Sequence, residues 1–93
     1  MRLIESSSAF KRDFKRESKG RYKKTLELTF VGVIQKLAND IALEPQYKNH
    51  PLIGEWSEFW ECHIKPDLLL IYKKVDIDRL LLARIGSHSE LFR

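Results

Sequence analysis

The sequence predicts an α+β domain in which two helices pack against an antiparallel sheet. Two stretches between residues 8 and 41 repeat apolar residues every three or four positions, which is the spacing of amphipathic helices. Residues 58–85 instead form three short apolar runs separated by turn residues, which is typical of a strand meander. With 93 residues the chain can bury one hydrophobic core but not two, so we expect a single domain over residues 1–93.

The N-terminal part has the pattern of a strand followed by the first helix. Residues 2–5 are predicted to form a short strand. Three serines follow, and one of them can cap a helix, because a serine oxygen accepts an unpaired N–H of the first turn. Phe10 and Phe14 are four residues apart and share a helix face, and Gly20 is expected to end the helix.

The second helix is predicted over residues 22–39, antiparallel to the first. Gly32 lies inside it, where glycine costs about 1 kcal/mol relative to alanine, so we expect a close packing contact there. Its apolar face is predicted to comprise Leu26, Phe30, Val33, Ile34, Leu37 and Ile41. Together the two helices are expected to cover one face of the sheet.

A loop is predicted over residues 44–57, between the helices and the meander. This segment shows no regular apolar period and contains two prolines and Gly54. It holds His50 and Trp56. Loops that are held on a rigid scaffold often carry functional residues.

Three strands are predicted after the loop, at residues 58–64, 67–74 and 79–85. Their connections are short, so the strands should pair as an antiparallel meander. Residues 68–71 are apolar on both faces, which predicts that the second of these strands is central and buried. A short final turn, capped by Ser87, is expected over residues 87–92.

Strand alternation predicts which side chains share a face of the sheet. Glu61 and His63 share one face of the first meander strand. On the third strand, alternation places Leu80, Leu82 and Arg84 on one face and Leu81, Ala83 and Ile85 on the other. The face away from the helices is then partly open, with His63 and Arg84 as its polar groups. Asp67 and His88 lie near its end, so a concave polar site is expected there.

Composition excludes several classes of protein. A hydrophobic content of 43% with 32% charge is ordinary for a globular domain, and no apolar run reaches the roughly 18 residues of a membrane helix. The single Cys62 allows no internal disulfide and is predicted to be a small buried strand residue. The N-terminus lacks a signal-peptide pattern, because Arg2 and Glu5 interrupt it. We therefore expect a cytoplasmic protein without a membrane partner.

Positive charge is concentrated at the start of the chain. Residues 1–24 carry nine Lys or Arg and three Asp or Glu, a balance of +6, whereas the remainder stands at −2. A basic region favours a polyanionic partner, because phosphate contacts and counterion release drive such binding. An acidic protein partner fits the charge equally well, and so does a helix face that is only solvated.

All three histidines lie in the last 44 residues, each within a short motif. Histidine titrates near neutrality, so one imidazole can accept a proton while another donates one. A small basic protein that gathers histidines, an aspartate and an arginine can cleave RNA without a metal. His50, His63 and His88, with Asp67 and Arg84, are therefore the candidate catalytic and substrate-binding residues.

These residues lie in four runs that together resemble the YafQ branch of the RelE superfamily of bacterial toxins. The runs are His50-Pro51-Leu52, Gly54-Glu55-Trp56, residues 61–72 (Glu-Cys-His-Ile-Lys-Pro-Asp-Leu-Leu-Leu-Ile-Tyr) and residues 84–92 (Arg-Ile-Gly-Ser-His-Ser-Glu-Leu-Phe). The resemblance covers about the last 45 residues, and the order of strand, two helices and meander fits the family's fold. One departure is Leu68, since some relatives have an aromatic residue directly after the aspartate.

The resemblance implies an mRNA interferase that enters the ribosomal A site and cuts the mRNA during translation. Its implied partners are the 70S ribosome with its mRNA and a cognate antitoxin protein, with no cofactor and no metal. The implied catalytic residues are His50, His63, Asp67 and His88, with Arg84 and Phe92 binding the substrate.

Chemistry assigns provisional roles to these groups. Cleavage without a metal uses the ribose 2′-OH as nucleophile, so it needs a base, an acid and cations around the phosphorane. We predict His88 as the general acid and either Asp67 or His63 as the general base. His50 and Arg84 would bind the phosphate, and Phe92 would stack on a base.

Three other functions compete with this interpretation. A metal enzyme is disfavoured because no pair of histidines has a tight ligand spacing. A ParE-like toxin that inhibits DNA gyrase by contact would leave the histidine set without a purpose. A non-catalytic module that binds RNA or the ribosome predicts binding without cleavage.

Overall fold

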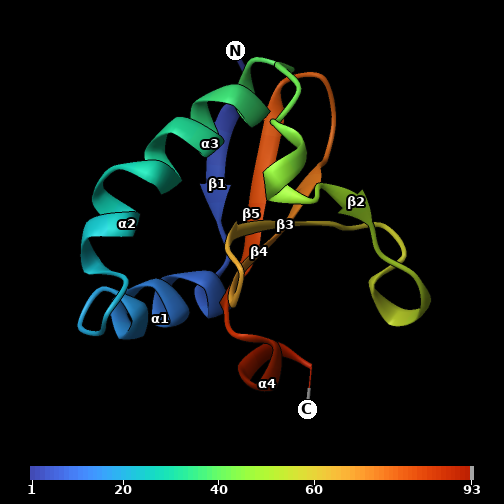
Figure 1. Cartoon of the computed structure of the whole chain (residues 1–93). Helices are drawn as coiled ribbons and strands as arrows, with labels where there is room; N and C mark the ends of the chain where they lie inside the picture. Colours follow the sequence, from blue (N-terminus) through green and yellow to red (C-terminus); the bar gives the residue numbers. More distant parts are fainter. Residues whose placement is uncertain (93) are drawn as a thin grey trace.

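The computed structural model describes residues 1–92 and has one five-stranded sheet with its first three helices on one face (Figure 1). The elements in chain order are β1 (Leu3–Ser6), α1 (Ser8–Glu17), α2 (Lys23–Glu27), α3 (Thr29–Ala38), η1 (Pro45–Tyr47), β2 (His50–Pro51), η2 (Gly54–Trp56), β3 (Trp60–Lys65), β4 (Leu68–Lys74), β5 (Arg79–Gly86) and α4 (His88–Leu91). Across the sheet the strand order is β1-β5-β4-β3-β2. Only β1 pairs in parallel, against β5.

The predicted α+β class and the order of strand, helix pair and meander are confirmed. The sheet is larger than the meander, because β1 joins it beside β5 and the short β2 joins it beside β3. β2 lies inside the predicted loop, and a strand of two residues is too short to show an alternating pattern. None of the helices in the described part of the chain is long and apolar enough to cross a membrane.

The predicted second helix is divided in two at Leu28. The backbone of Leu28 (φ −118°, ψ −74°) lies between α2 and α3, and its side chain is 73% exposed. A Cβ on Gly32 would meet nothing within 4 Å, so the predicted close contact at this glycine is wrong. Ile41 lies beyond α3 and is 55% exposed, so it does not belong to the apolar face. Phe10, Phe14 and Phe30 instead join α1 to α3.

The sheet carries apolar packing on both faces. The larger cluster lies between the helices and the sheet and includes Phe10, Phe30, Leu37, Cys62, Leu70, Leu82 and Ile85. A smaller cluster on the other face comprises Leu69, Ile71, Ala83 and Leu91, with Leu52, Trp56 and Phe59 against it. Residues 68–71 of β4 are 0% exposed, which confirms the prediction of a central, buried strand. Cys62 is also fully buried, and burial together with the charge of Glu61 raises the pKa of its thiol to about 12.

A β-bulge in β5 overturns the predicted alternation of its side chains. Ile71 pairs with Arg84 while the next residue, Tyr72, pairs with Leu82, so Ala83 is an extra residue in β5. A bulge of this kind shifts the alternation by one position. Leu80, Leu82 and Ile85 therefore face the helices, whereas Ala83 lies in the cluster on the other face.

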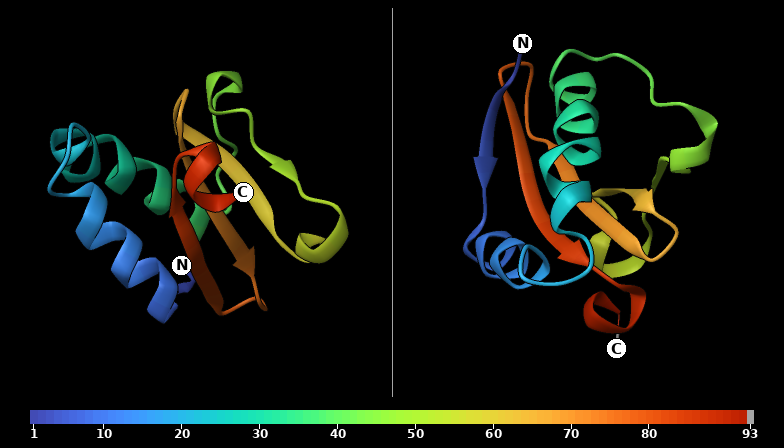
Figure 2. Two further views of the ribbon diagram at one scale, coloured as in Figure 1. Left: turned by 90° about the horizontal axis from the view of Figure 1, so that it is seen from below. Right: turned by 60° about the vertical axis from the view of Figure 1, so that its left-hand side comes forward.

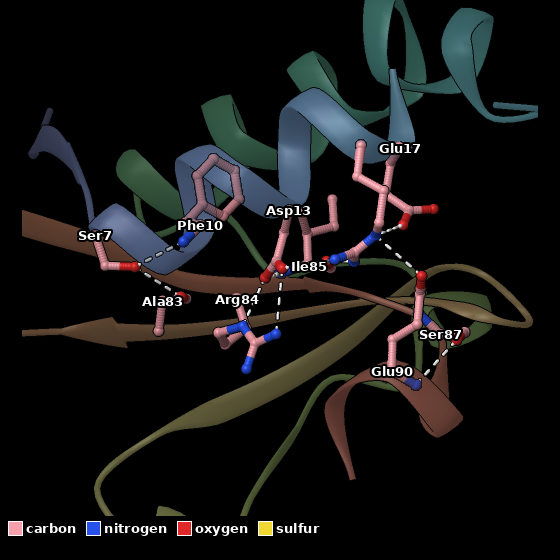
Figure 3. A network of polar contacts seen from close by, with 10 residues as sticks. Ser7, Phe10, Asp13, Glu17, Ala83, Arg84, Ile85, Ser87 and Glu90 are labelled. Atoms are coloured by element: carbon pink, nitrogen blue, oxygen red, sulfur yellow. Dashed lines mark hydrogen bonds and ion pairs between the residues drawn. The ribbon is translucent and has the colours of Figure 1, made fainter. Parts of the chain in front are cut away.

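The buried Asp13 carboxylate joins α1 to the outer edge of β5 (Figure 3). β1 ends at Ser6, so the last residues of β5 have no neighbouring strand on that side. The Ile85 N–H donates to Asp13 Oδ2 at 3.2 Å, and Arg84 donates through Nε at 2.6 Å and Nη2 at 3.2 Å. Burial opposes the charge of Asp13, but these hydrogen bonds and the charges of Arg84 and Arg16 outweigh it and lower its pKa.

We predict that Asp13→Asn lowers the free energy of unfolding by about 2–3 kcal/mol, because Arg84 then lacks its carboxylate in a partly buried position. The lowered pKa means that this stabilisation is complete above the unfolded-state value of about 3.9. It is lost as the pH falls through the lower folded-state pKa. Urea titrations at several pH values measure both effects, with Glu27→Gln as the exposed control. Equal unfolding free energies for parent and Asp13→Asn at pH 7 would contradict the account.

Candidate functional site

His50 is held on β2 through both of its ring nitrogens. Nδ1 lies 2.6 Å from the Lys48 carbonyl oxygen, and Nε2 lies 3.1 Å from Glu61 Oε2. Lys48 has φ 47° and ψ 45°, the left-handed conformation that residues with side chains rarely adopt. This conformation ends η1 and places the Lys48 carbonyl against the imidazole.

Glu61 is a buried carboxylate between two histidines. Its residue is 5% exposed, and Oε2 lies 3.1 Å from His50 Nε2 and 3.4 Å from His63 Nε2. The register of the sheet explains this meeting, because His50 pairs with Glu61, and His63 lies two residues further along β3 on the same face. Buried carboxylates are rare unless they are paired, so two imidazoles account for its burial.

The contacts of His50 define its hydrogen-bonding state. A backbone carbonyl and a carboxylate can only accept, and a neutral imidazole has a single N–H. Donation to Lys48 O and Glu61 Oε2 at once requires an imidazolium, and the pair with Glu61 would then be charge-assisted. The same carboxylate favours a proton on His63 Nε2, which leaves a lone pair on His63 Nδ1.

The three histidines form a row that ends at Phe92. The ring centroids of His50 and His63 are 6.2 Å apart, and those of His63 and His88 are 5.7 Å apart. The Phe92 ring lies 6.4 Å from that of His88 and is 39% exposed. The structure thus brings together residues from β2, β3 and α4 that were predicted to share a site.

Asp67, in the turn between β3 and β4, orients His88. Asp67 Oδ1 accepts from the His88 backbone N–H at 3.2 Å and lies 3.3 Å from His88 Nδ1. The backbone N–H first, and then the ring, lower the pKa of this exposed carboxyl below its usual value. Asp67 therefore stays ionised at neutral pH and favours a proton on His88 Nδ1, which directs Nε2 away from the carboxylate.

Arg84 lies apart from the histidine row. Its guanidinium donates to the Asp13 carboxylate, and this hydrogen bond raises the pKa of Arg84 above its usual value. Glu61 of β3 and Arg84 of β5 pair with opposite sides of Ile71 in β4, so one strand separates Arg84 from Glu61. The side chain keeps 27% exposure, so one edge of the guanidinium remains open to an anion.

A hollow adjoins the histidine row between η1 and the end of β3. It has a volume of about 490 Å³ and is lined by Gln46, Tyr47, Lys48, His63, Ile64, Lys65, Pro66 and His88. Two lysines and one aromatic ring beside two imidazoles suit the phosphate and base of a nucleotide.

Sequence reasoning missed two residues of this site. Glu61 was placed on the face of His63 but was given no role, because a charged strand residue is exposed by default. Lys48 acts through its backbone carbonyl, and a backbone contact has no sequence signature. One signal for Glu61 was available. A strand carboxylate can pair with a histidine two positions along its own strand and with another on the neighbouring strand.

The fold, with histidines along the open face of the sheet, is that of the RelE-like toxins. A profile of the family described as "Bacterial toxin of type II toxin-antitoxin system, YafQ" matches residues 2–93, and the chain belongs to this family. The mRNA interferase toxin YafQ of Escherichia coli K12 is 36% identical over 91 residues, which are 98% of this chain and 96% of that protein.

Solved structures of similar proteins agree with this placement. A metal-bound toxin from Helicobacter pylori is 44% identical with a TM-score of 0.84, and a copper-bound toxin variant from the same species is 39% identical with a TM-score of 0.91. Each match covers 99% of this chain and 100% of the other. One chain of the E. coli DinJ-YafQ complex is 33% identical with a TM-score of 0.80, and the match covers all of this chain and all of that one.

The metal-bound relatives run against the sequence-based expectation of a protein that takes no metal. Imidazole and carboxylate groups are donors that zinc and copper accept, and His50, Glu61 and His63 supply them. Within residues 1–92, however, no group of three His, Cys, Asp or Glu side chains is arranged to hold a metal ion. Both histidine Nε2 atoms instead lie next to Glu61 Oε2, at 3.1 Å and 3.4 Å.

Proposed function

We propose that this protein is an mRNA interferase that cuts mRNA in the ribosomal A site by attack of a ribose 2′-OH on its own phosphate. Membership of the YafQ toxin family and the name of its E. coli relative support the mRNA interferase activity. The observation that carries the mechanism is the histidine row, with one carboxylate bound to each end.

In the proposed reaction the 2′-oxygen bonds to phosphorus and the bond from phosphorus to the 5′-oxygen breaks. The products are a 2′,3′-cyclic phosphate and a 5′-hydroxyl. The 2′ proton goes to a base, and a proton from an acid goes to the departing 5′-oxygen. The 2′-OH makes the reaction specific for RNA.

His88 suits the general acid, because Asp67 binds its Nδ1 side and leaves Nε2 for the leaving oxygen. This contact also favours His63 over Asp67 as the general base, since Asp67 already accepts two hydrogen bonds from His88. A neutral His63 with its proton on Nε2 keeps Nδ1 free to take the 2′ proton. His50, as an imidazolium held by Glu61, is the cation that stabilises the phosphorane.

Substrate binding extends from the histidine row in two directions. The hollow beside Tyr47 and Lys48 takes a nucleotide next to the scissile phosphate. Next to His88 at the end of the row, the partly exposed Phe92 stacks on a base. Arg84 contributes a second positive charge at the open face while Asp13 holds it in place.

The basic first 24 residues supply the electrostatic attraction for two partners at different times. Phosphates of the ribosome and its mRNA are one partner, and an acidic cognate antitoxin is the other. The complex of E. coli YafQ with DinJ supports an antitoxin for this member of the family. A footprint of the basic residues on each complex, measured by hydrogen exchange, tests whether both partners cover them.

The test of the proposed function is primer extension on mRNA in a reconstituted translation system, with the parent protein and His88→Ala. We expect parent-dependent cuts at the A-site codon, none on free mRNA, and a loss of at least about 100-fold with His88→Ala, the scale of a lost general acid. Equal cutting by both proteins would show that His88 is not the general acid. No cuts by either on active ribosomes, with inhibition of DNA supercoiling, would favour a gyrase toxin instead.

Glu61→Gln tests the buried carboxylate. Glutamine keeps the shape but removes the charge that pairs with His50, so we expect cleavage to slow at least about tenfold, which corresponds to about 1.4 kcal/mol. The matched control is Glu58→Gln, which removes an exposed carboxylate just before β3, the strand that carries Glu61. A Glu61→Gln protein that melts like the parent and cuts at the parent rate would contradict the role given to Glu61.

A further inference from the structure

The turn that carries His88 is too short to be stable by itself. α4 spans four residues, and an isolated helix of one turn does not form in water. Leu91 packs into the smaller apolar cluster, and Asp67 binds His88 from the exposed side. A further restraint on α4 comes through Glu90.

Glu90 closes the first turn of α4 as a capping box. Its Oε1 accepts from the Ser87 N–H at 2.8 Å, and its own N–H donates to Ser87 Oγ at 3.2 Å. This pair fixes the backbone on both sides of His88. The position of the His88 imidazole therefore depends on where the Glu90 carboxylate is held.

Arg16 of α1 holds that carboxylate. Its Nε lies 3.0 Å from Glu90 Oε2 and 2.8 Å from Glu17 Oε2. Its Nη1 lies 3.1 Å from Asp13 Oδ1, and its Nη2 donates to the Ile85 carbonyl at 3.3 Å. One guanidinium thus joins α1, the end of β5 and α4, which lie at the same end of the sheet (Figures 1 and 3).

Gly86 is the residue that lets the guanidinium approach. A Cβ at this position would lie 2.9 Å from Arg16 Nη2 and 3.0 Å from Glu90 Oε1. Any side chain there would therefore displace one member of the pair. The glycine in the Arg-Ile-Gly-Ser-His run is explained by this ion pair rather than by a special backbone conformation, because its φ is not positive.

We propose that Arg16 is a positioning residue for His88, acting through Glu90 and the capping box rather than by contact with RNA. This inference rests on the proposed function, in which His88 is the general acid. The electrostatics agree with it, because the pKa of Glu17 is raised by burial and by the nearby charge of Glu90. Without Arg16 the two carboxylates lose the cation that they share, so the Glu90 carboxylate is no longer held in this position.

The experiment measures cleavage of mRNA on stalled ribosomes with an open A site, under single-turnover conditions over a range of toxin concentrations. Arg16→Gln is expected to lower the maximal rate constant about tenfold and to leave the half-saturating concentration within about twofold of the parent value. Glu90→Gln keeps the capping hydrogen bond but loses the ion pair, and it is expected to give the same loss. The double variant should be no slower than either single variant, because both remove one interaction.

Arg79→Gln is the matched control, since it removes an exposed, ion-paired arginine from the opposite end of β5. It is expected to cut at the parent rate. A parent rate for Arg16→Gln or for folded Glu90→Gln would overturn the inference, and so would a raised half-saturating concentration at an unchanged maximal rate. If the parent does not cut, the proposed function has failed rather than the role of Arg16. If His88→Ala cuts as fast as the parent, His88 is not the general acid, and the inference about Arg16 fails with it.

Discussion

The buried carboxylate of Asp13 is the contact on which the proposed catalytic end of the molecule depends. β1 is shorter than β5, so the last residues of β5 have no strand beside them on that edge. Side chains of Ser7 and α1 make hydrogen bonds to this edge instead. Ser7 donates to the Ala83 carbonyl at 2.7 Å, Asp13 accepts from the Ile85 N–H, and Arg16 donates to the Ile85 carbonyl. α1 thus takes the place of a neighbouring strand at the point where β5 leads into α4.

This attachment gives the open face of the sheet a rigid frame. The fully buried β4 supplies its centre, and the two strands beside it carry Glu61 and Arg84 in one register row. His50, Arg84 and His88 each have a carboxylate partner on a separate part of the chain. Figure 2 shows how α4 and the segment around β2 approach this face from different parts of the chain. The proposed acid and cation are therefore held by different carboxylates, Asp67 and Glu61.

The sequence predicted the parts of the structure that repeat or that match a motif. The spacing of apolar residues predicted the α+β class, the strand meander and the buried central strand. The motifs predicted that His50, His63, Asp67 and His88 belong to one site. Local pattern could not reveal the bulge at Ala83, because the surrounding residues are all compatible with a regular strand. The break at Leu28 likewise has no glycine or proline to mark it. The partner of Arg84 lies 71 residues away, so its pairing is a property of the fold alone.

The central claim is that imidazoles, without a metal, activate the ribose 2′-OH. The most direct measurement uses ribosome-bound mRNA with one 2′-deoxy nucleotide before the cut, in the presence of 1,10-phenanthroline, which removes zinc and copper but leaves the ribosome's magnesium. The account predicts that this bond stays intact while the all-ribose mRNA is cut to a 2′,3′-cyclic phosphate and a 5′-hydroxyl. Cleavage at the deoxy position, or cleavage of all-ribose mRNA that the chelator abolishes, would contradict it.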